Sequence, residues 1–130
     1  MKKRNIGSPM TGITKRLSVA FRLMRERHLI ARQNFTCCQT CGSYEIVEDA
    51  MKRIAAGRRV DGYAFFHHQD AQSLRASEDF HIAYGSVQDN CADSAVENVG
   101  KIVVDCLTLA GISTEWSGSP HQRIRVKVAA

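Results

Sequence analysis

The sequence predicts an α+β domain of two layers, in which helices pack against a four-stranded, mainly antiparallel sheet. Two observations lead to this class. Apolar residues recur at helical spacing in two early segments and in a late one, and short segments rich in aromatic and β-branched residues alternate with them. The 130 residues, 44% hydrophobic and 24% charged, suffice for a single core. We expect a flexible basic arm over residues 1–11 and one folded domain over residues 12–130.

The amino-terminal part predicts two helices. Over residues 13–31 the apolar positions return every three or four residues and the basic ones fall opposite, so this helix should bury one side and expose a cationic one. Gly42 and Ser43 then offer a break and an N-cap for a second helix that stops at Gly57. The stripe expected to bury the second helix consists of Tyr44, Val47, Met51, Ile54 and Ala55.

Strands are predicted in the middle of the chain. The β-prone residues 60–68 form the first, with both faces at least partly covered, and residues 79–85 form the second. Between them Asp70 can cap a short helix that runs through Arg75.

The carboxyl-terminal part predicts a long helix and a hairpin. The helix starts at Asp93 or Ser94 and closes at Gly111, and residues 113–116 and 122–128 flank turn-forming residues. In the last strand the apolar residues alternate with basic ones, so one face should join the core and the other should be solvated. The basic members are Arg123, Arg125 and Lys127.

Charge and cysteine usage suggest a compartment and a partner. The formal net charge of +5 is concentrated in the first quarter of the chain, and no apolar stretch approaches the roughly 20 residues that span a bilayer. Five cysteines, an odd number, favour reduced thiols, so we expect a cytoplasmic protein that does not bind membranes. The cationic helix face should bind the acidic surface of a macromolecular partner, either protein or nucleic acid, through Lys15, Arg22, Arg25 and Arg27.

The run Cys37-Cys38-Gln39-Thr40-Cys41 holds three of the five cysteines. Zinc takes about four ligands, and the spacing of Cys38 and Cys41 suits two sulfurs on one ion, with Cys37, His67, His68 and His81 as candidates to complete the site. A redox pair at a helix start, or thiols that are simply buried or cap the helix, are the alternatives.

A second polar cluster closes the aromatic strand. His67, His68, Gln69 and Asp70 follow it, and polar side chains at a strand end commonly line a pocket. An imidazole beside a carboxylate can act as a general base or a metal ligand. In the alternative reading, one histidine faces solvent, the other makes a hydrogen bond in the core, and Asp70 only caps the next helix.

Three blocks of the chain resemble one family. The segments 31–42 and 62–70, which carry the patterns FxCCQTCG and GYxFxHxQD, and the segment from Ala110 to Trp116 are similar to an uncharacterised bacterial family of small soluble domains. The similarity covers about residues 28–128. It implies a bacterial or phage origin and a shared fold, without implying a reaction, and it suggests that the cysteine and histidine clusters meet in space.

Two functions therefore stand as predictions. The leading one is a non-enzymatic cytoplasmic domain that binds an acidic macromolecule through its basic helix, with the cysteine run and His67 shaping a structural site and zinc as the candidate cofactor. The alternative is a thiol- or zinc-dependent protein with its site at the cysteine run and His67, with Asp70 nearby.

Overall fold

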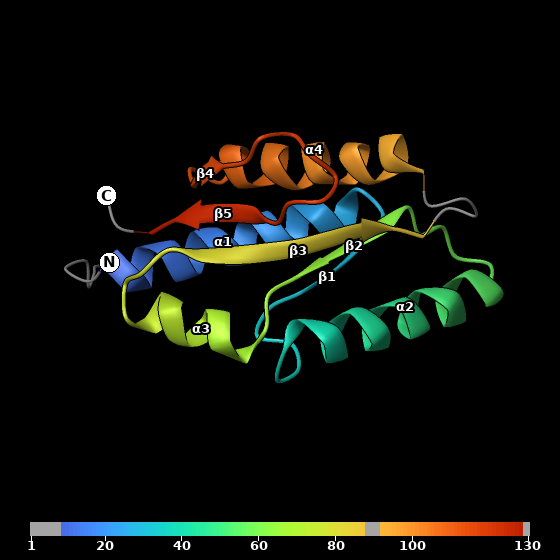
Figure 1. The fold of residues 1–130 in the computed structure, drawn as a ribbon, viewed down its shortest axis with the longest axis horizontal. Coiled ribbons are helices and arrows are strands. Elements are labelled where there is room, and N and C mark those ends of the chain that lie inside the picture. The colour runs from blue at the N-terminus through green and yellow to red at the C-terminus, as the bar shows by residue number, and fades with distance from the viewer. Residues whose placement is uncertain (1–8, 88–91, 129–130) are drawn as a thin grey trace, which may run out of the picture.

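The structure, a computed structural model, describes residues 9–87 and 92–128, and these ranges contain four helices and five strands. In chain order the elements are α1 (Pro9–Glu26), β1 (Leu29–Arg32), α2 (Gln39–Ala55), β2 (Gly62–Phe65), α3 (His68–Arg75), β3 (Phe80–Ser86), α4 (Asp93–Leu109), β4 (Ser113–Glu115) and β5 (Ile124–Lys127) (Figure 1). Helix α1 begins at Pro9, within the predicted arm, and residues 1–8 of that arm lie outside the described residues. The α+β class is confirmed.

The strands form one sheet in the order β1-β2-β3-β5-β4. Strand β1 pairs parallel with β2, and the other three neighbouring pairs are antiparallel. The sheet is therefore mixed and five-stranded, so the predicted count of four strands is wrong. The additional strand is β1, whose residues the helical pattern over residues 13–31 had assigned to the first helix.

A backbone reversal separates α1 from β1. The helix ends at Glu26, and His28 adopts a φ of 68°, a left-handed conformation that a helix cannot continue through. The carbonyl of His28 then accepts a hydrogen bond of 2.9 Å from the backbone N–H of Asp61, just before β2. Residues 29–31 are buried on both sides of the sheet, so they show no alternation by which the sequence could have revealed a strand.

Helices cover both faces of the sheet, so the structure has three layers where two were predicted (Figure 1). Helices α1 and α4 pack together on one face, in a core that includes Phe21, Phe80 and Val103. Helix α2 packs on the other face, where Ile46 joins Phe65 in a second, smaller core.

The exposed side of α2 also differs from the prediction. The residues of α2 that are buried are Gly42, Ile46 and Ala50, whereas Tyr44 and Met51, from the predicted buried stripe, are exposed. A helix with apolar residues on two sides offers two possible buried faces, and the spacing alone does not choose between them.

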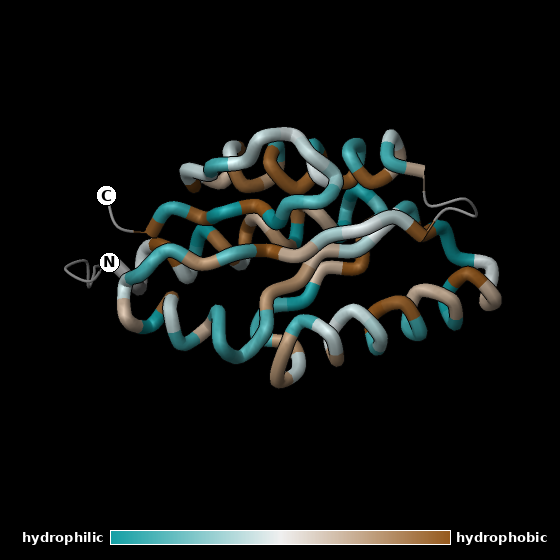
Figure 2. Tube along the Cα trace, in the orientation of Figure 1, coloured by the Kyte–Doolittle hydropathy of each residue, from teal (hydrophilic) through white to brown (hydrophobic). Residues whose placement is uncertain are grey.

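Strands β4 and β5 extend the sheet beyond α2. In β5, Ile124 and Val126 are buried while Arg125 and Lys127 are exposed, which confirms the predicted alternation, and Figure 2 shows it in the hydropathy colours. Within residues 9–87 and 92–128, no helix is both long enough and apolar enough to cross a membrane.

Candidate metal centre

The cysteine run follows β1 through a loop that is fastened to the end of β2. The backbone N–H of Phe35 donates to the carbonyl of Phe66 (2.9 Å), and that of His68 donates to the carbonyl of Thr36 (3.0 Å). Thr36 has a φ of 63°, which is strained for a β-branched residue. Its hydroxyl donates to the carbonyl of Cys38 (3.0 Å), so the strained residue is held directly before the cysteines.

Helix α2 begins directly after Cys38, which is its N-cap, and not at Ser43 as predicted. Gly42 lies inside the first turn, where its N–H donates to the carbonyl of Cys38 (3.0 Å). A Cβ atom on Gly42 would lie 2.4 Å from a ring carbon of Phe65 and 2.9 Å from the hydroxyl oxygen of Thr36. Gly42 therefore does not break the helix. It allows the first turn of α2 to approach the sheet closely.

Three cysteine side chains gather at this helix start. The Sγ atoms of Cys37, Cys38 and Cys41 all lie within 4.8 Å of one another. Cys37 and Cys41 are exposed and Cys38 is half-buried. Zinc–sulfur bonds of about 2.3 Å in a tetrahedral site place the sulfurs about 3.8 Å apart. Small side-chain movements would therefore bring the three sulfurs onto one ion, and the cluster can hold a metal.

The cluster has three members in the described part of the chain. No histidine, aspartate or glutamate there lies within the same distance of all three sulfurs. His67, which the sequence suggested as a further ligand, belongs to a different cluster. Cys106 is buried in α4 among core residues.

Two of the three thiols ionise in a defined order. The backbone N–H of Cys41, and next its thiol, stabilise a thiolate at Cys38 and lower the pKa of Cys38. Hydrogen bonding of the Cys41 thiol to Cys38 and Cys37 raises the pKa of Cys41 to about 11. The contact between the Cys38 sulfur and the N–H of Cys41 does not have the geometry of a full capping hydrogen bond, so the sulfur is held only weakly at the start of α2.

The start of α3, by contrast, is closed by a reciprocal pair of side chains. His67 is the N-cap, and its Nδ1 accepts a hydrogen bond from the backbone N–H of Asp70 (3.3 Å). The Asp70 carboxylate accepts from the backbone N–H of His67 (3.3 Å) and of His81 (3.4 Å), and lies 3.2 Å from Nε2 of His67. This is a capping box with histidine at the cap, so the predicted cap, Asp70, is instead the third helical residue.

The four residues predicted to line a pocket divide into two pairs. His67 and Asp70 are nearly completely buried and bond to each other. His68 and Gln69 are exposed, and Nδ1 of His68 contacts the side-chain oxygen of Asn34. None of these four residues lines any of the three surface cavities, of about 700, 580 and 120 Å³, on the described part of the chain.

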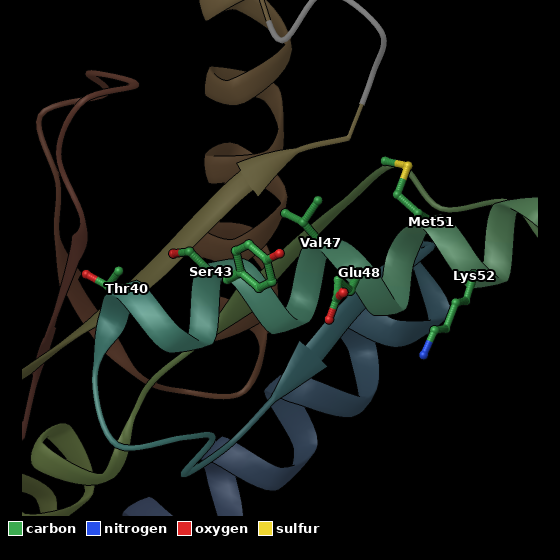
Figure 3. A pocket seen from close by; sticks show the side chains of 7 residues that line it. Thr40, Ser43, Val47, Glu48, Met51 and Lys52 are labelled. Atoms are coloured by element: carbon green, nitrogen blue, oxygen red, sulfur yellow. The ribbon is translucent and has the colours of Figure 1, made fainter.

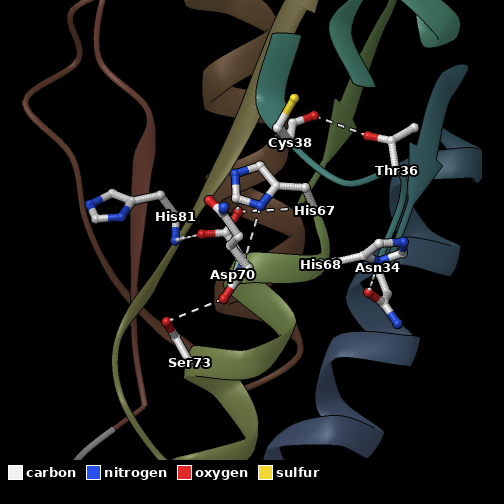
Figure 4. Close-up of polar contacts among 9 residues, drawn as sticks. Asn34, Thr36, Cys38, His67, His68, Asp70, Ser73 and His81 are labelled. Carbon is white, nitrogen blue, oxygen red and sulfur yellow. Dashed lines mark hydrogen bonds and ion pairs between the residues drawn. The ribbon is translucent and has the colours of Figure 1, made fainter. Parts of the chain in front are cut away.

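The two clusters are neighbours through the backbone, but their side chains serve different purposes. Figure 4 shows Thr36 and Cys38 beside the start of α3, with the Cys38 sulfur pointing away from the ring of His67. The imidazole of His67 turns toward Asp70, in the direction of His81. The structure therefore brings the two sequence blocks together without showing one shared pocket.

The basic residues of α1 lie on its exposed side. Lys15, Arg22 and Arg25 of α1 are exposed, and so is Arg27, which lies in the turn after α1 and not on the helix as predicted. Arg22 forms an ion pair with Glu26 (3.8 Å), and the guanidinium of Arg25 donates to the carbonyl of Ala31 (2.9 Å). No hydrogen bond or ion pair joins the side chain of Lys15 or of Arg27 to another described residue.

Sequence reasoning missed three surface cavities. One, of about 700 Å³, runs along the exposed side of α2 and includes Tyr44 and Met51. The other two, of about 580 Å³ and 120 Å³, lie near the start of β5, and both are lined by Gln122 and Arg123. The alternation along β5 indicated which of its side chains face solvent. It did not indicate the cavity that His81 and Arg125 line, because this cavity depends on the pairing of β5 with β3.

Comparisons with known proteins identify the family. Neither a search of the curated proteins nor a search of the solved structures found a match. A family model described as a domain of unknown function (DUF6891) matches residues 7–130, which is nearly the whole chain. The chain belongs to this family, DUF6891.

Proposed function

We propose that the protein is a zinc-binding domain, in which Cys37, Cys38 and Cys41 hold the ion as thiolates at the start of α2. The observation that carries the proposal is the gathering of three sulfurs within 4.8 Å of one another on an exposed surface. Thiolates are soft ligands that select zinc, copper(I) or iron–sulfur clusters over magnesium and calcium. Zinc fits a compact tetrahedral arrangement of sulfur ligands.

The fourth coordination position is left for a ligand from outside the described residues. Structural zinc sites are closed by four protein ligands, whereas sites with three keep a position for water or another molecule. The exposure of Cys37 and Cys41 leaves room for such a ligand. We therefore propose a site whose fourth position is filled from outside the described residues, in a reducing cytosol where the thiols persist.

The surrounding fold supports a metal site in this position. The loop before the cysteines is fastened to the end of β2, and Gly42 holds the first turn of α2 against Phe65. These contacts position the backbone of all three ligands from one rigid side. A site on a fixed scaffold binds a metal with less loss of conformational entropy than one on a free loop.

Metal content and a thiol-specific spectrum test this proposal. Protein purified without chelator should contain one zinc per chain by elemental analysis, and Co²⁺ replacement should give intense thiolate charge-transfer absorption. Cys37→Ser, Cys38→Ser and Cys41→Ser should each remove most of the metal, while Cys106→Ala, at the buried cysteine of α4, should retain it. Absence of stoichiometric metal, or equal retention in all four variants, would overturn the proposal.

A second candidate function is the binding of an acidic macromolecule by the exposed face of α1. Lys15 on α1 and Arg27 in the turn directly after it favour this function, because the side chains of these two exposed cations have no ion-pair partner among the described residues. Unpaired surface cations attract nucleic acids and acidic proteins by a force that salt screens.

Reversal of these two charges tests the second candidate. Lys15→Glu combined with Arg27→Glu should weaken binding of an RNA or DNA oligonucleotide, or of polyglutamate, by about tenfold at low salt. The matched control is Arg58→Glu combined with Arg75→Glu, which reverses two exposed charges elsewhere, one in the loop after α2 and one on α3. Equal loss in both pairs, or binding that does not weaken with salt, would exclude α1 as the binding face.

A further inference from the structure

The solvent side of α2 carries an apolar stripe that the described part of the chain leaves uncovered. The described residues include five large hydrophobic side chains that are exposed, and three of them lie on α2. These are Tyr44, Met51 and Ile54, which are 71%, 47% and 40% exposed. Val47, half-buried, lies between them. The four positions are separated by three, four and three residues, which is the spacing of a helix face that packs along another helix.

Charged residues flank this stripe. The groove of about 700 Å³ along α2 is lined by Val47 and Met51 on one edge, and by Glu48 and Lys52 on the other (Figure 3). The side chains of Glu48 and Lys52 make no ion pair or hydrogen bond with another described residue, unlike that of Asp49, which pairs with Arg32 and Arg53. The flanking charges are therefore available to a partner.

We propose that this face of α2 binds a second copy of the chain, with the two α2 helices packed antiparallel about a twofold axis. The order of charges along the helix selects this partner and this direction. Glu45 and Glu48 lie toward the amino end of the stripe and Lys52 toward the carboxyl end. Antiparallel packing places the acidic half of each helix opposite the partner's Lys52, twice by symmetry. Parallel packing would place Glu48 opposite the partner's Glu48, and like charges oppose association.

The apolar residues match in the same arrangement. With the axis passing near the middle of the stripe, Tyr44 packs over the partner's Ile54, and Val47 packs over the partner's Met51. Tyrosine and methionine are enriched in the cores of interfaces, where they supply area and adapt in shape. Because each copy contributes mainly one helix, the interface is smaller than a standard one and the dimer should dissociate on dilution.

Sedimentation of the full chain over a wide dilution series tests the apolar part of the proposal. The mass of the unsubstituted protein should rise with concentration from 14.5 kDa toward twice that value. Met51→Glu should remain a folded monomer throughout, as judged by circular dichroism. Leu109→Glu, at an equally apolar position that is 75% exposed on α4, should dimerise normally. Cys38→Ser should also dimerise, since the interface does not involve the metal.

Exchange of the flanking charges tests the direction. Glu48→Lys and Lys52→Glu should each weaken the dimer about fivefold, and the double variant should recover most of that loss, because it restores opposite charges across an antiparallel interface. Three results would overturn the proposal: a wild-type protein that is monomeric at every concentration, a Met51→Glu variant that dimerises like the wild type, or a double variant no better than the single ones.

Discussion

The starts of α2 and α3 lie side by side in the structure, and they treat their polar groups in opposite ways. At α3, His67 and Asp70 satisfy each other and bind the N–H of His81, in a nearly buried capping box. At α2, the sulfur of the N-cap Cys38 has only a weak contact with the N–H of Cys41, and Cys37 and Cys41 expose their sulfurs beside it.

The difference shows which cluster is free to act. A buried carboxylate that already accepts hydrogen bonds from two backbone N–H groups has a structural role that any other task would disrupt. Exposed thiols with no such role can exchange protons, bind a metal or react without cost to the fold. Both clusters were predicted to carry chemistry, and the cysteines are the ones whose side chains are left available.

Removal of one side chain from each helix start should give the largest contrast in stability. Asp70→Ala leaves the backbone N–H groups of His67 and His81 without a partner, so we expect a loss of about 2–4 kcal/mol in the free energy of unfolding. Cys38→Ala in metal-free protein should cost about 1 kcal/mol or less, because only the weak contact of its sulfur with the N–H of Cys41 is lost. Urea unfolding measures both, and comparable losses would contradict the difference between the two starts.

The close contact of α2 with the sheet predicts a somewhat smaller effect. Gly42→Ala introduces a methyl group into the space held by the Phe65 ring, and should destabilise the fold by about 1–3 kcal/mol. Gly12→Ala is the matched control, since a methyl group there meets no atom within 4 Å and alanine favours a helix. If both substitutions proved harmless in thermal unfolding, the close contact would be refuted.

The order of thiol ionisation predicts a difference in reactivity. In metal-free protein at a pH of about 9, iodoacetamide should modify Cys38 about tenfold faster than Cys41, whose pKa is raised to about 11. The ratio stays moderate because a thiolate with a lower pKa is also a weaker nucleophile. Peptide mapping by mass spectrometry gives both rates, and earlier modification of Cys41 would contradict the assigned order.

The smallest expected effect is a pH dependence of the folding stability that arises from His81, next to the capping box of α3. Burial, and next the charge of Arg123, lower the pKa of His81; Arg125 adds to this, while Asp70 and Asp79 oppose it. The unfolded chain therefore takes up the proton at a higher pH than the folded one. Stability from this group is complete above a pH of about 6.5 and is lost as the pH falls toward the lower folded pKa. His81→Gln should reduce the loss of urea resistance on acidification; an unchanged loss would rule out this contribution.

Elements with one strong pattern could be predicted from the sequence. The amphipathic face of α1, the alternation in β5 and the left-handed Gly57 and Gly111 that follow α2 and α4 all match the structure. In each case local spacing and the buried side coincide, so a local pattern carries the information.

The missed features depend on contacts that are distant in sequence. Strand β1 was read as helix because its apolar residues continue the spacing of α1, and the left-handed His28 that separates them has no glycine to announce it. The start of α2 was misplaced because Gly42 looks like a helix breaker until Phe65 is seen against it. The cysteine spacing did suggest a metal site, but only the fold assigns His67 to Asp70.

X-ray absorption at the zinc edge would test the central claim most directly, because it reports the atoms bound to the metal. Zinc-loaded protein should show about three sulfur neighbours near 2.3 Å and one lighter neighbour near 2.0 Å. A spectrum with nitrogen and oxygen neighbours alone would contradict the assignment of the open helix start as the metal centre.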